Sequence, residues 1–211
     1  MLQGNSFTIF GGQVFDHFVK GQFANVSNAI DNLADAEILK NEKDIQGFAR
    51  TLWESHKIGP PPQVDFTRDR VKVSPYLMDV TVKDHFNRMV KVPRAIVRYS
   101  VPIIGHNTEL LKVCPYNYIE MQIKVQIESG NTLVFEIDSG YANVNFPAEK
   151  QTEINRYALA VRDFITKTSK ALQNAIGEFN NKLFDFILER AQVRLSKVHQ
   201  IQRNINNLNP F

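Results

Sequence analysis

The chain has 211 residues, of which 43% are hydrophobic and 22% are charged, and its net charge is +3. This composition is typical of a globular protein and excludes an intrinsically disordered one. No apolar run approaches the ~20 residues that cross a bilayer, and the first residues lack the pattern of a signal peptide. A single cysteine, Cys114, excludes an intrachain disulfide framework. We therefore expect a cytoplasmic protein without a membrane segment.

The first sixty residues predict a pair of helices. After an irregular opening rich in Gly and Phe, apolar side chains at helical spacing predict a helix from Gln22 to about Leu33. Asn41 is the expected cap of a second helix, whose apolar stripe includes Ile45 and Trp53. This helix must end before the run Gly59-Pro60-Pro61-Pro62, because proline lacks the N–H that a helix interior needs.

The middle of the chain alternates apolar and polar residues with the period of β-strands. The pattern is strict between Ile119 and Ile127, and Ser129-Gly130-Asn131 predicts a turn into a further strand over 132–137. Short strands with tight turns and no crossover helices are typical of an antiparallel sheet, and we expect about four to six strands.

The last third of the chain, from Pro147 to about Leu208, predicts one long amphipathic helix. Its apolar residues recur in steps of three and four. If continuous, ~60 residues at ~1.5 Å rise would span about 90 Å. Gly177 is the expected kink, and a bent continuous helix is favoured over a helical hairpin. The predicted fold is therefore α+β, with a body over residues 1–146 and a helical arm over 147–211.

No pattern of catalytic, metal-binding or cofactor-binding residues emerges from the sequence. The five histidines stand in five segments without ligand spacing, and neither a phosphate-binding loop nor a dinucleotide fingerprint is present. Acidic residues on the expected strands could hold the metal of a nuclease, but the solvent face of a half-buried sheet explains them better. They are Glu120, Glu128, Glu136 and Asp138. The pair Asp84-His85 has no nucleophile tied to it. We expect a non-enzymatic protein without a cofactor.

Several short motifs occur in a recognisable order. They are Lys57-Ile58-Gly59-Pro60-Pro61, Val101-Pro102-Ile103-Ile104-Gly105 followed by Leu110-Leu111 and Pro115, and Phe179-Asn180-Asn181-Lys182-Leu183 followed by Ile187, Glu189-Arg190 and Arg194. This order resembles an uncharacterised bacterial module that forms the N-terminal part of larger proteins, some of them antiviral defence effectors. The resemblance covers about residues 35–200 and brings no catalytic residues with it. In that module the helix leads into an effector domain, so it implies either a truncated polypeptide or a separately encoded effector partner.

The long apolar stripe predicts an assembly role, because so much apolar surface would not be left in water. The expected function is protein interaction, either self-association or binding of a separate effector protein, through a helical seam. The candidate interface residues are Ile154, Val161, Phe179, Leu183, Ile187 and Leu195. The alternative is a nucleic-acid-binding protein, since the helix end carries four cations. The candidate phosphate contacts are Arg190, Arg194, Lys197 and Arg203. A metal-dependent nuclease ranks last.

Overall fold

The computed structural model of the protein describes residues 5–116 and 120–208. Its contacts divide the chain into two compact units. Unit 1 consists of residues 1–15 and 61–173, and unit 2 of residues 16–60 and 174–211. The division falls inside the long C-terminal helix, whereas the sequence predicts one body over residues 1–146 and a helical arm over 147–211. The first helices and the sheet therefore belong to different units.

Unit 1 is built on a six-stranded antiparallel sheet, which confirms the predicted α+β class. The strands are β1 (Phe7–Thr8), β2 (Gln63–Val64), β3 (Lys72–Lys83), β4 (Met89–Ile104), β5 (Lys124–Glu128) and β6 (Thr132–Asp138). Their order is β1-β5-β6-β4-β2, and β3 also pairs with β4. The predicted strand over 119–127 is shorter than expected, because β5 begins at Lys124. Ile119 lies outside the described residues.

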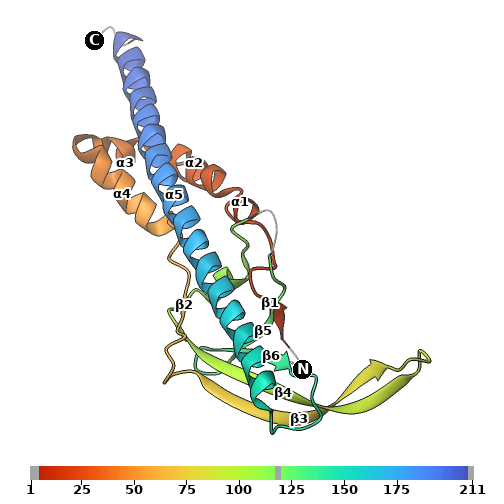
Figure 1. The fold of residues 1–211 in the computed structure, drawn as a ribbon. Coiled ribbons are helices and arrows are strands. Elements are labelled where there is room, and N and C mark those ends of the chain that lie inside the picture. The colour runs from red at the N-terminus through yellow and green to blue at the C-terminus, as the bar shows by residue number, and fades with distance from the viewer. Residues whose placement is uncertain (1–4, 117–119, 209–211) are drawn as a thin grey trace. The chain divides into compact units, whose positions relative to one another are not determined.

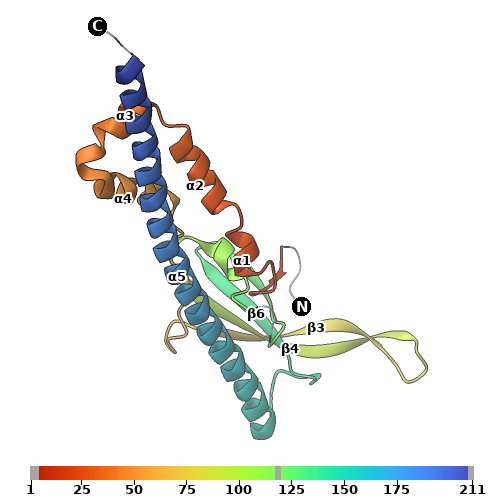
Figure 2. The same ribbon diagram turned by 90° about the horizontal axis from the view of Figure 1, so that it is seen from above.

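One face of the sheet carries the core of unit 1. The register places Tyr99 opposite Phe135 and Val101 opposite Leu133, and all four side chains are buried. Residues 148–173 of the helix α5 (Ala148–Leu208) belong to this unit and lie along the sheet in Figures 1 and 2. Every second side chain of β4 from Val97 to Ile103 is buried, as the period of two requires, but Ile96 and Val134 on the other face are fully buried as well.

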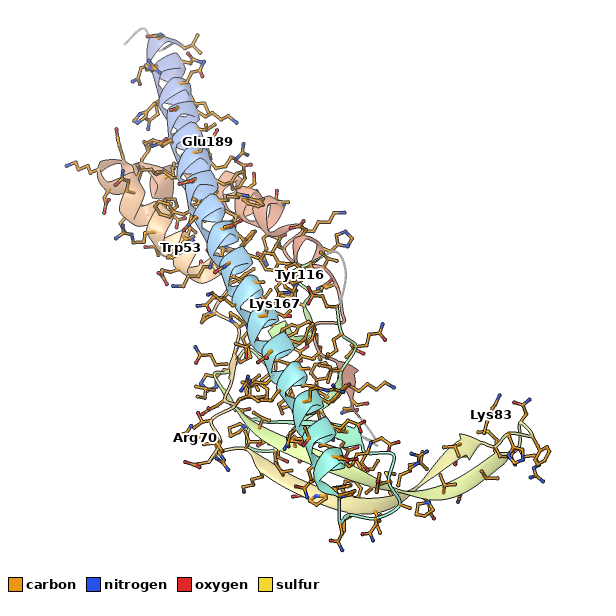
Figure 3. The ribbon with its side chains drawn as sticks, in the orientation of Figure 1. Trp53, Arg70, Lys83, Tyr116, Lys167 and Glu189 are labelled. Atoms are coloured by element: carbon orange, nitrogen blue, oxygen red, sulfur yellow. The ribbon has the colours of Figure 1, made fainter. Side chains whose placement is uncertain are left out.

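Strands β3 and β4 form a hairpin that continues past the sheet as a two-stranded arm (Figure 2). Pairing between β4 and β6 stops at Ile96, whereas pairing between β3 and β4 runs on to Lys83 and Met89. Figure 3 shows Lys83 near the tip of this arm. Asn87 closes the turn with a φ of 62°, in the left-handed region that asparagine tolerates better than most residues.

Unit 2 contains the predicted helix pair and two further short helices. Its helices are α2 (Gln22–Asp31), α3 (Asp35–Lys40), α4 (Ile45–His56), most of the short α1 (Phe15–Phe18) and residues 174–208 of α5. Short α3 did not stand out in the sequence. The predicted cap of α4 at Asn41 is wrong by three residues, since the carboxylate of Asp44 accepts the N–H of Gly47 at 2.8 Å.

Helix α5 is one uninterrupted element from Ala148 to Leu208. This finding confirms the long helix and excludes the helical hairpin. Gly177 lies inside the helix and is exposed to solvent.

Candidate functional surfaces

The first part of the predicted interface is covered within unit 1. Val161 is fully buried and Ile154 nearly so. Phe164, on the same helix, lies edge-on to Phe10 with ring centroids 6.2 Å apart. These side chains belong to the core under the sheet, so a partner cannot reach them in the folded unit.

The second part of the predicted interface is covered within unit 2. Phe179, Leu183 and Ile187 are buried, and Leu195 is half-buried. The ring of Phe23 in α2 meets Phe179 edge-on at 5.5 Å between centroids. This part of the apolar stripe of α5 therefore packs on the short helices of its own unit, and its buried side chains are not available to another chain.

The apolar stripe of α5 continues beyond the point where the short helices of unit 2 bury it. Val198 is fully buried, but Ile201, Ile205 and Leu208 are 47%, 60% and 83% exposed. Within unit 2, this end of α5 runs on past α2 and α4 (Figures 1 and 2). The three side chains recur at spacings of four and three, the same pattern that is buried earlier in the helix.

The four candidate phosphate contacts divide into two pairs. Arg190 forms an ion pair with Asp31 at 2.5 Å, and Arg194 forms one with Asp35 at 2.5 Å. Arg194 also donates to the backbone carbonyl of Leu33 at 3.0 Å. Two of the four arginine and lysine side chains therefore attach α5 to the α2–α3 segment, and a phosphate would have to displace these carboxylates.

The other pair, Lys197 and Arg203, is exposed. The contact from Arg203 Nε to the carbonyl of His199, one helical turn earlier, is long at 3.4 Å. His199 itself lies 3.1 Å from the carboxylate of Glu42. The basic end of the helix thus presents two cations to solvent rather than four.

The strand carboxylates are each paired with a donor. Glu136 accepts from the hydroxyl of Tyr76 at 2.8 Å and lies 3.6 Å from Arg98, which also pairs with Glu128. Burial and this hydrogen bond to Glu136 raise the pKa of Tyr76 to about 12, so its hydroxyl stays a donor at neutral pH.

The two remaining candidates lie apart from this network, and Glu120 precedes β5 instead of lying on the strand expected from the sequence. Glu120 pairs with Lys167 at 2.9 Å, and Asp138 accepts the N–H of Gly140 at 2.8 Å. Among the described residues, no group of three or more acidic, histidine or cysteine side chains is placed to hold a metal ion.

The pair Asp84-His85 belongs to the turn of the β3–β4 arm. The carboxylate of Asp84 accepts the N–H groups of Phe86 and Arg88 and pairs with the Arg88 guanidinium at 2.8 Å. These contacts, the backbone hydrogen bond from Arg88 foremost, hold the pKa of Asp84 below its usual value. The ring of His85 lies against the ring of Phe86 instead. Asp84 and His85 therefore stabilise a turn and do not contact each other as an acid–base pair would.

A groove in unit 1 was not expected from the sequence. It has a volume of about 510 Å³ and is bordered by the loop before β3, by β3, β4 and β6, and by the first turns of α5. The lining residues are Phe66, Arg68, Val71, Val73, Tyr99, Phe135, Asn155, Ala158, Leu159 and Arg162. They come from distant parts of the chain, so no local motif marks them.

Comparisons of the chain with family models, with curated proteins and with solved structures found no match. In the described part of the chain, no helix has the length and apolar character needed to span a membrane.

Proposed function

We propose that the protein is an interaction module that self-associates through the last turns of α5. The observation that supports this proposal is the exposed continuation of the buried seam, which consists of Ile201, Ile205 and Leu208. Exposed apolar side chains are ordinary when they are scattered, but these three share one helix face and extend a packed stripe. The proposed interface is therefore this exposed segment and not the whole length of the helix.

A second copy of the chain fits this face. The spacing Val198, Ile201, Ile205, Leu208 alternates steps of three, four and three, which are those of a coiled-coil heptad. The residues that would flank the seam, Gln202 and Asn204, are uncharged. Flanking charges select or reject partners in such helix pairs, and beside Ile201, Ile205 and Leu208 these two positions carry none, whereas Lys197 flanks the seam only beside the buried Val198.

The expected association is weak. Each Ile or Leu side chain gains about 1.5–3 kcal/mol when it is fully buried, and part of that gain is offset by the cost of bringing two molecules together. Three such residues on each chain therefore predict a dissociation constant of about 10 µM to 1 mM.

Analytical ultracentrifugation over a wide concentration range tests the proposal. We expect a monomer–dimer equilibrium in the wild-type protein and a monomer at all concentrations after Ile201→Asp or Ile205→Asp. Asn207→Asp is the matched control, because Asn207 is exposed about one third of a turn or more from the seam and the substitution adds the same charge. Circular dichroism of each variant checks that the helix content is unchanged.

A wild-type protein that stays monomeric up to millimolar concentration would refute self-association, as would equal effects of Ile205→Asp and Asn207→Asp. The nucleic-acid alternative relies on Lys197 and Arg203, and it predicts salt-dependent binding to a DNA duplex that is lost on their joint replacement by Gln. A part in bacterial defence and a separately encoded effector partner stay predictions from the resemblance.

A further inference from the structure

We propose that the groove in unit 1 binds a small amphipathic carboxylate, with its apolar body against the aromatic floor and its carboxylate at Arg68. This inference concerns a different surface from the end of α5 and does not depend on self-association. All of the lining residues belong to unit 1.

The floor and walls of the groove are apolar. The rings of Tyr99 and Phe135 are stacked, with centroids 4.9 Å apart and an angle of 2° between their planes. Val73 and Leu159 line the groove and are 52% and 49% exposed, so the groove leaves apolar surface in contact with water. A ligand that covered these side chains would gain free energy in proportion to the apolar area it removes from water.

The charge of the groove is positive. Arg68 and Arg162 are the charged members of the lining, which contains no acidic residue. Arg162 is already paired with the neighbouring Asp163 at 2.8 Å. The exposed guanidinium of Arg68 forms no ion pair or hydrogen bond with any described residue, so its donors are available to an anion.

Tyr99 adds a second available donor. Its ring is buried, and its hydroxyl forms no hydrogen bond with another side chain in the described part of the protein. Burial raises the pKa of Tyr99, so the hydroxyl keeps its proton at neutral pH. The hydroxyl is not among the buried polar atoms that lack a partner, so it is reached by water, and a ligand oxygen would take the place of that water.

The size and chemistry together define the ligand class. A volume of about 510 Å³ lies within the range of small-molecule sites. An apolar lining with few polar groups disfavours sugars and nucleotides, whereas a planar guanidinium matches the two oxygens of a carboxylate. A medium-chain fatty acid combines both features.

Isothermal titration calorimetry with decanoate, below its micelle concentration, tests the site. Decyltrimethylammonium, which has the same chain and the opposite charge, is the matched probe. We expect decanoate to bind and the cation to bind at least about tenfold more weakly, since one charge-assisted hydrogen bond is worth about that factor. Arg68→Gln should weaken decanoate binding by about tenfold, and Tyr99→Phe by about threefold.

Two further variants distinguish the contribution of the carboxylate to affinity from that of the hydrocarbon chain. Lys72→Gln removes an exposed cation outside the groove and should leave decanoate binding unchanged. Leu159→Gln, at an exposed helix position, should weaken both probes because it removes apolar contact. Absence of decanoate binding, equal binding of the two probes, or an Arg68→Gln variant with wild-type affinity would overturn the proposal.

Discussion

Asn180 illustrates how one polar side chain fixes a chain segment. Its amide accepts the N–H of Ile58 at 3.0 Å and donates to the carbonyl of the same residue at 2.9 Å. The backbone carbonyl of Asn180 accepts the indole N–H of Trp53 at 2.8 Å. The segment that leads out of α4 is thus tied to α5 within unit 2, immediately before the run of prolines.

We expect Asn180→Ala to lower the free energy of unfolding by about 2 kcal/mol, because it removes two hydrogen bonds and leaves half-buried backbone groups unpaired. Asn181→Ala is the matched control, since Asn181 is exposed, and it should change stability by less than about 0.5 kcal/mol. Urea denaturation followed by Trp53 fluorescence measures both. Equal effects of the two substitutions would show that the Asn180 contacts contribute little.

At the scale of elements, two helices each contain a glycine, and the space around the two glycines differs. Gly177 lies in the interior of α5, and a Cβ atom placed there would meet no atom within 4 Å. Gly47 lies in the first turn of α4, where a Cβ atom would lie 2.1 Å from the Asp44 carboxylate that caps the helix. The same substitution therefore has opposite consequences in the two helices.

Gly177→Ala should raise the free energy of unfolding by about 0.5–1 kcal/mol, because alanine loses less backbone entropy in a helix. Gly47→Ala should lower it by about 1 kcal/mol through loss of the cap. Thermal unfolding followed by circular dichroism gives the sign of each change. A destabilising Gly177→Ala would indicate that α5 needs the flexibility of glycine, as the kink expected from the sequence implies.

At the scale of the whole molecule, one apolar stripe has three environments. It is buried under the sheet in unit 1, buried against short helices in unit 2, and exposed after Val198. Residues of the same type along α5 consequently contribute to different properties. The buried part determines stability, and we propose that the exposed part determines association.

Leu183→Ala should lower the free energy of unfolding by about 3 kcal/mol, since Leu183 is fully buried and its truncation leaves a cavity. Ile205→Ala should change the stability of the monomer by less than about 0.5 kcal/mol, because its side chain is already in water. Urea denaturation at a concentration where the protein is monomeric measures both. A large loss of stability in Ile205→Ala would place that side chain in the core.

The sequence by itself determined the fold class and the main elements, because helical and strand periodicities are local properties of a chain. The hairpin turn at Ser129-Gly130-Asn131, the helix before the prolines and the continuous helix to Leu208 all follow from neighbouring residues. The cap of α4 was misplaced because Asn41 and Asp44 are both good caps, and the turn at Glu42–Asp44 decides between them.

Only the tertiary structure decided which surfaces are free. Periodicity marks an apolar face but does not say what covers it, so Leu183 and Ile205 look alike in the sequence and differ in burial. Arg190 and Arg194 look like free cations until Asp31 and Asp35 are placed beside them. The groove likewise exists only after residues from the loop before β3, the sheet and α5 come together, because its chemistry depends on distances in space.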